Sequence, residues 1–267
     1  FLKHIEKSER IANEQSNSLF KAYVYKLYSN HLRNKNNHDE SLEYGLKSEL
    51  MLGQLDSIPR IKLNILYDIA NCYHKLRNYD LQLTYSKELL PLSIKLKDAE
   101  AIIAARNAIG VAYNNKKEYE SATKHFEEAY ELTYSDSTFY NAIPNVQTKR
   151  NFMKANAGIN LYYANNLDKS SEILQDIIDE NSSDFLVTGA RIFLGRMALD
   201  SNNLKRARTL LTEVKEPSKN KHQVYYPMVL AGLIKLNTIE GYHEASESLI
   251  NELLNYGKKH KNMSNLR

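Results

Sequence analysis

Residues 107–129 read NAIGVAYNNKKEYESATKHFEEA, and this stretch decides the fold. Two small residues, Gly110 and Ala122, stand twelve positions apart on either side of a polar segment, and the bulky Phe126 follows. Two helices of a hairpin can approach closely where both carry small residues, and bulky side chains then fill the groove beside the contact. The stretch therefore predicts an antiparallel pair of helices joined by a short turn.

The same spacing recurs six times along the chain. The first small position falls at Ser29, Ala70, Gly110, Gly158, Gly195 and Leu233, and the second at Ser41, Gln82, Ala122, Ser170, Ala207 and Ala245. Only Gln82 and Leu233 depart from the preference for small residues. Successive copies are 37 to 48 residues apart. A single helical hairpin cannot bury both of its faces, so the repeat predicts hairpins that stack on one another.

Composition agrees with a helical fold and excludes several classes of protein. The 267 residues include only nine Gly and five Pro, which argues against a turn-rich β sandwich or barrel. No apolar run approaches the ~18 residues of a membrane span. The single cysteine, Cys72, excludes an internal disulfide, and we expect it to be a small packed residue. The net charge of +4 is spread evenly, which argues against direct nucleic-acid binding.

Turn residues support the same frame. Asn and Gly tolerate the left-handed backbone that ends a helix. The expected turns are Asn36-Asn37, Arg77-Asn78, Lys117-Glu118, Asn165-Asn166, Asn202-Asn203 and Glu240-Gly241. Pro59 after Asp56-Ser57 predicts a helix start, and Pro91 is expected to kink or end the helix that contains it. The 48-residue step predicts extra chain around Ser135–Asn145.

The repeat resembles the tetratricopeptide family. Ile109, Gly110, Tyr113, Ala122 and Phe126 match its pattern, although Arg106 stands where the family has Trp. The resemblance extends from Phe1 to about Lys261. It implies an all-α, right-handed superhelical solenoid of antiparallel helix pairs, with about six hairpins and a leading helix. The expected organisation is one array over 1–267, with a leading helix over 1–18 and repeats at about 22–55, 63–97, 103–136, 151–184, 188–216 and 226–260.

In such arrays the first helix of each repeat lines a concave groove, which binds a peptide or a partner helix. The polar and aromatic residues at the groove positions predict a ligand-binding face: Tyr23, Lys26, Asn30, Arg33, Asn64, Tyr67, Asn71, His74, Asn107, Asn114, Tyr162 and Arg196. Asn237 is expected in the groove as well. Amide groups suit the backbone of an extended peptide, Lys and Arg suit a carboxylate, and Tyr offers flat contact area. The alternative is a solvated helix face that happens to be concave.

One known arrangement matches only in part. Some tetratricopeptide domains hold a peptide carboxylate with Lys and Asn at the positions of Lys26 and Asn30. Asp68 stands where a further Asn is expected, and Ala104 and Ala108 replace basic residues. A complete carboxylate clamp is therefore not expected.

The repeats also resemble sensor segments of bacterial signalling proteins, in which such arrays regulate an output domain. No phosphate-binding loop, metal-ligand spacing or nucleophile motif is present, so we expect no enzyme activity, catalytic residue, cofactor or metal. The predicted function is a non-catalytic module that binds a peptide or protein partner. Its expected location is the cytoplasmic or periplasmic face of a membrane-tethered regulator, as a piece of a longer protein with a DNA-binding or kinase output. The alternatives are a static assembly scaffold and an RNA-associated repeat protein. Pairing of two copies through exposed end helices also stays open.

Overall fold

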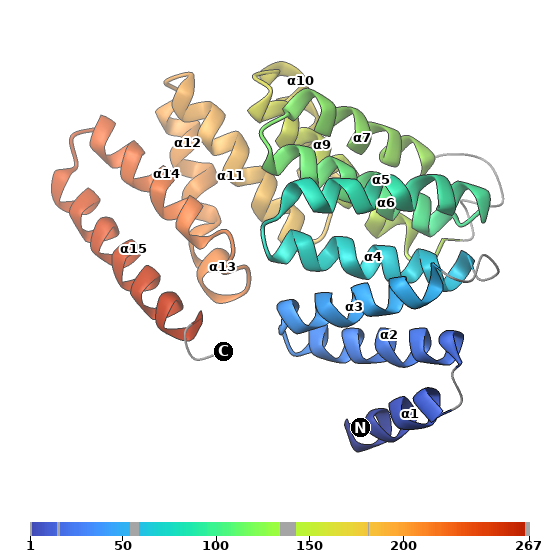
Figure 1. Cartoon of the computed structure of the whole chain (residues 1–267). Helices are drawn as coiled ribbons and strands as arrows, with labels where there is room; N and C mark the ends of the chain where they lie inside the picture. The colour runs from blue at the N-terminus through green and yellow to red at the C-terminus, as the bar shows by residue number, and fades with distance from the viewer. Residues whose placement is uncertain (1, 15–16, 54–58, 134–142, 181, 265–267) are drawn as a thin grey trace. The chain divides into compact units, whose positions relative to one another are not determined.

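The computed structural model describes residues 2–14, 17–53, 59–133, 143–180 and 182–264. Over these residues the chain is helical and contains no strand. Helix α1 (Leu2–Glu14) precedes six antiparallel hairpins (Figure 1). The hairpins are α2 (Ser18–Asn34) with α3 (His38–Leu52), α4 (Pro59–Lys75) with α5 (Tyr79–Lys95), α6 (Ala99–Asn115) with α7 (Tyr119–Leu132), α9 (Val146–Tyr163) with α10 (Leu167–Asp179), α11 (Asp184–Asp200) with α12 (Leu204–Glu213), and α14 (Tyr226–Ile239) with α15 (His243–Ser264). The prediction of an all-α fold of helical hairpins is confirmed.

The chain forms two compact units, Phe1–Met153 and Lys154–Arg267. Within the first unit each hairpin packs on the next, because α3 contacts α4 and α5 contacts α6. Within the second unit α10 contacts α11, and α14 contacts both α11 and α12. Each hairpin thus buries its apolar residues against a neighbour, as a stacked repeat requires.

Close contact between the two helices of a hairpin depends on the small residues of the repeat. A Cβ added to Gly110 would lie 2.7 Å from Cε1 of Phe126, and one added to Gly195 would lie 2.9 Å from Cγ of Leu211. Phe126 and Leu211 are buried. The glycines therefore make room for the bulky residue sixteen positions later in the same repeat.

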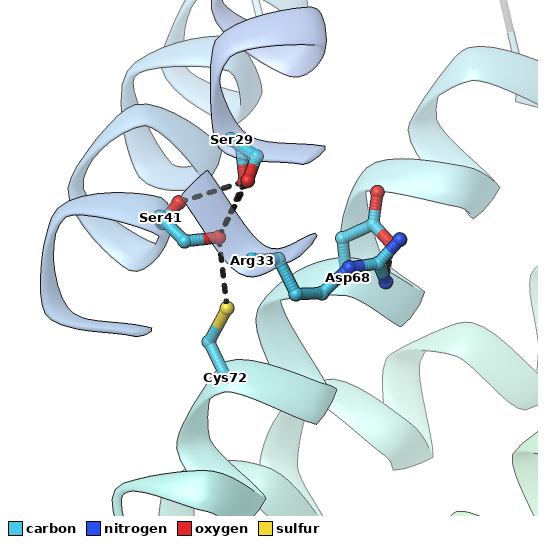
Figure 2. Close-up of polar contacts among 5 residues, drawn as sticks. All are labelled: Ser29, Arg33, Ser41, Asp68 and Cys72. Atoms are coloured by element: carbon cyan, nitrogen blue, oxygen red, sulfur yellow. Dashed lines mark hydrogen bonds and ion pairs between the residues drawn. The ribbon is translucent and has the colours of Figure 1, made fainter. Parts of the chain in front are cut away.

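The first repeat achieves the same packing with different residues. Gly45 stands where the third and fifth repeats have the bulky residue. The Ile69 side chain from α4 fills the space instead, and its Cγ1 lies 3.1 Å from a Cβ built on Gly45. Ser29 and Ser41 each donate to the other's carbonyl oxygen, at 2.7 and 2.8 Å (Figure 2). Cys72 is buried, with its Sγ 3.3 Å from Ser41 Oγ, so the prediction of a packed cysteine is confirmed.

Gln82 is the long residue that stands at a small-residue position of the second repeat. This side chain is buried, and its Nε2 donates to the carbonyl oxygen of Ala108 on α6 at 3.1 Å. A long polar residue is tolerated at this small-residue position because it bonds to the next repeat.

The predicted turns have the expected backbone. Asn36, Arg77, Lys117, Asn165, Asn202 and Gly241 all have φ between +57° and +80°. The following residue is the N-cap of the next helix at Asn37, Asn78, Glu118, Asn166 and Asn203. Five of the six first helices begin about one turn before the predicted repeat starts.

The predictions made for the prolines are confirmed only in part. Pro59 begins α4 as predicted, while its flanking Asp56-Ser57 lie outside the described residues. Helix α5 runs through Pro91 to Lys95, so the expectation that Pro91 could end the helix is wrong. Pro217 lies inside α13 (Lys215–Asn220), a short helix that the sequence did not predict. Most of the extra chain predicted around Ser135–Asn145 lies outside the described residues.

Candidate functional site

The side of α2 that was predicted to line the groove carries four polar or aromatic residues. Tyr23 is exposed, and Lys26, Asn30 and Arg33 are half-buried. Their spacing of three or four residues places them on one side of the helix.

Arg33 has a partner within the chain. Its guanidinium donates to the carboxylate of Asp68 on α4, across the contact between the first two repeats (Figure 2). The Asp68 side chain is 9% exposed and that of Arg33 is 30% exposed. Burial raises the pKa of Asp68, while the charges of Arg33 and Lys26 oppose that rise. The carboxylate that Lys26 and Arg33 were expected to meet is therefore present in the chain itself.

A first cleft of about 260 Å³ lies on the first-helix side of the second and third repeats. It is lined by Leu63, Asn64 and Tyr67 of α4, Leu89 of α5, and Asp98, Glu100, Ala101 and Ala104 of α6. The two predicted residues of this set, Asn64 and Tyr67, lie one helical turn apart, and Tyr67 is 39% exposed. The small side chain of Ala104 leaves room opposite them.

The acidic groups of the first cleft are already compensated. Asp98 caps α6 by accepting from the Ala101 N–H at 2.9 Å and also pairs with Arg60. Lys149 Nζ lies 2.7 Å from Glu100 Oε1. The first cleft therefore offers an amide and an aromatic ring to a ligand, with little net charge.

The remaining predicted residues of the first unit lie on α4 and α6. Asn71, Asn107 and Asn114 are half-buried. His74 is half-buried as well, and its Nδ1 lies 3.3 Å from Oε1 of Gln82. Burial lowers the pKa of His74, so its imidazole favours the neutral form.

A second cleft, of about 370 Å³, lies in the second unit. It brings together two predicted residues, Tyr162 of α9 and Arg196 of α11, whose guanidinium carbon is 5.2 Å from the Tyr162 ring centroid. The same carbon is 5.6 Å from the centroid of Phe193. These distances are typical of a cation over aromatic rings.

The sequence missed several residues of the second cleft. Asp200 of α11 and Lys235 of α14 lie on its wall, beside Leu199, Pro227, Met228, Ala231 and Gly232. Asn237, which was expected in the groove, is instead buried and accepts from Arg208 Nη2 at 3.0 Å. Helix α14 therefore presents a different side from the one predicted. The neighbouring small residues Ala231 and Gly232, which line the second cleft, were the signal that could have indicated this.

Among the residues that the structure describes, no three His, Cys, Asp or Glu side chains lie together as metal ligands would. Within the same described ranges, no helix is both long enough and apolar enough to cross a membrane.

No protein-family model matches the sequence, and no curated protein matches it. Solved structures do match in fold. The apo form of RapI has a TM-score of 0.71 at 13% identity, covering 98% of this chain and 92% of that one. The apo quorum sensor NprR from B. thuringiensis has a TM-score of 0.67 at 15% identity, covering 95% and 81%.

NprR in complex with its cognate peptide NprX is also similar, with a TM-score of 0.60 at 16% identity, covering 94% of this chain and 70% of that one. The TPR-like repeats of a Podospora anserina putative kinesin light chain give 0.59 at 11% identity, covering 75% and 98%. At these identities the likeness concerns the fold. The chain therefore has a tetratricopeptide-like helical repeat fold.

Proposed function

We propose that the chain is a non-catalytic module that binds a peptide in clefts on its first helices, as the sensory part of a bacterial signalling protein. In this proposal the ligand acts on an output domain, DNA-binding or kinase, carried by the same full-length protein. The observation that carries the proposal is the pair of clefts on the first helices, one in each unit, lined by predicted groove residues.

The chemistry of the clefts suits a peptide. In the first cleft, the side-chain amide of Asn64 has no hydrogen-bond partner among the described residues, so it can both donate to and accept from a peptide backbone. Tyr67 and Tyr162 supply rigid aromatic contact area at small entropic cost. Solvated helix faces without clefts would lack this concave shape, which ligand sites generally have.

The structural likeness to NprR supports the same proposal. NprR is a quorum sensor and has been captured with its cognate peptide NprX. A shared fold alone does not transfer a function, so the proposal depends on the side chains of this chain.

Affinity selection tests the proposal. The immobilised chain is incubated with a pool of random synthetic heptapeptides, and the retained peptides are identified by mass spectrometry. We expect a related set of peptides to be retained by the chain and lost with Tyr67→Ala. The matched control is Leu50→Ala, because Leu50 is 65% exposed on the second helix α3, outside both clefts. Retention of no peptide set, or equal loss with both variants, would contradict the proposal.

The alternative is a static scaffold for protein partners. A sensor should change when its ligand binds, whereas a scaffold should not. Small-angle scattering of the chain, with and without a retained heptapeptide, separates the two: a ligand-dependent change in radius of gyration favours sensing, and an unchanged radius favours the scaffold.

A further inference from the structure

Three cations were expected to line the groove, and the structure distinguishes them. Arg33 is paired with the buried Asp68, and Lys26 also acts on that carboxylate. Arg196 instead rests on the rings of Tyr162 and Phe193 and has no carboxylate within ion-pair distance among the described residues. Its guanidinium therefore keeps its hydrogen-bond donors available at the second cleft.

The acid nearest to Arg196 in the second cleft is neutralised by other groups. Lys235 Nζ lies 2.7 Å from Asp200 Oδ1, and the Tyr162 hydroxyl donates to Asp200 Oδ2 at 3.4 Å. Lys235 thus balances the charge of Asp200, and the positive charge of Arg196 remains. The second cleft has a net attraction for an anion.

The rest of the second cleft is apolar. Leu199, Pro227, Met228 and Ala231 line it beside the small Gly232. Its volume of about 370 Å³ is at the lower end of the ~300–1,000 Å³ found for small-ligand sites. An apolar side chain and an adjacent carboxylate would fill it, with the carboxylate on Arg196.

We infer that the second cleft binds the C-terminal residue of a peptide, an apolar side chain whose free α-carboxylate is held by Arg196. The inference rests on the proposed peptide-binding function and specifies which end of a peptide the second cleft binds. A guanidinium can bind a carboxylate through two parallel hydrogen bonds, which also fixes the orientation of the chain end. The ring faces of Tyr162 and Phe193 hold the guanidinium in place for this contact.

Methyl NMR provides a local test. The chain is labelled with ¹³C-methyl methionine, so that Met228 reports on the second cleft and Met51 of α3 serves as an internal control. The probes are acetyl-Ala-Ala-Leu as the free acid and as the carboxamide. We expect the acid to shift the Met228 signal in a saturable manner, the carboxamide to bind about tenfold more weakly or worse, and Met51 to stay unchanged.

Charge variants make the test specific. Arg196→Gln should weaken binding of the acid about tenfold or more and bring it to the level of the carboxamide. Asp200→Asn should strengthen binding of the acid, because it removes a negative charge from the cleft. Arg191→Gln is the matched control, since Arg191 is also on α11 but pairs with Glu213 at 3.3 Å outside the second cleft. Circular dichroism melting confirms that each variant is folded.

The outcomes separate this inference from the proposed function. Equal shifts with acid and carboxamide, no shift with either, or wild-type affinity in a folded Arg196→Gln chain would overturn the inference. If heptapeptides are retained in both their acid and amide forms, the peptide-binding function stands and the carboxylate site fails. If the acid tripeptide binds but no heptapeptide is retained, the carboxylate site stands and the peptide-sensing function fails.

Discussion

Replacing Arg33 by Met should destabilise the chain through the buried Asp68. The variant keeps most of the side-chain volume but leaves a carboxylate that is 9% exposed without its ion-pair partner. Breaking a buried pair by removing one partner typically costs ~3–5 kcal/mol. Because Arg33 is itself 30% exposed and Lys26 still acts on Asp68, we expect the lower end, about 3 kcal/mol at pH 7.

The double variant Arg33→Met, Asp68→Leu separates the charge from the packing. Replacing both partners by apolar residues removes the uncompensated carboxylate and is often neutral or stabilising. We therefore expect the double variant to recover most of the loss. The assay is urea unfolding followed by circular dichroism, which gives the free energy of unfolding for the wild type, both single variants and the double variant.

The loss should also depend on pH. Burial already raises the pKa of Asp68 in the folded chain, and removing Arg33 raises it further, whereas the unfolded chain ionises near the usual ~3.9. Between these values the folded variant holds a proton that the unfolded chain has released, so its stability falls as pH rises. The deficit relative to wild type should be small below pH 4 and grow toward neutrality. A deficit that is independent of pH, or a double variant as unstable as Arg33→Met, would refute the reasoning.

Three further predictions concern the fold. Gly110→Ala should lower stability in thermal melts by about 1–2 kcal/mol, because the added Cβ would lie 2.7 Å from the buried ring of Phe126. Gly257→Ala is the control: a Cβ added there has no atom within 4 Å, so the variant should gain up to about 1 kcal/mol. Asn78→Ala should lose about 1 kcal/mol because the Asn78 side chain accepts from the Leu81 N–H, while Asn166→Ala should lose less because it makes no such bond. Cys72 should resist a maleimide in the native chain and react on unfolding; fast native labelling, read by mass spectrometry, would contradict its burial.

The hairpins and their turns could be predicted because the signals are local. A small residue twelve positions before another, with Asn between them, specifies both the helix contact and the turn. In the first repeat, Ile69 fills the space that a bulky residue of the same repeat fills elsewhere. This could not be predicted, because Ile69 comes from the next hairpin. Residues that contact each other between repeats do not recur at a fixed spacing in the sequence, so the repeat pattern does not predict them.

The residues that line the two clefts could be predicted less well, for the same reason. Position on the first helix predicted that Asn64, Tyr67, Tyr162 and Arg196 face a groove, and in the structure Asn64 and Tyr67 line one cleft while Tyr162 and Arg196 line another. Position did not reveal that Arg33 would pair with Asp68, since that depends on how two repeats approach each other. Helix α14 presents Met228 and Lys235 to its cleft instead of Asn237, and the side it turns inward is set by packing against α11 and α12.

Hydrogen exchange with a selected heptapeptide tests the central claim most directly. Amide exchange is measured by mass spectrometry on the chain alone and with saturating peptide. Binding in the first cleft predicts slower exchange in α4 and α6, and binding in the second cleft predicts slower exchange in α11, with α3 and α12 unchanged in both cases. Protection confined to the second helices, or no protection at saturation, would contradict the account.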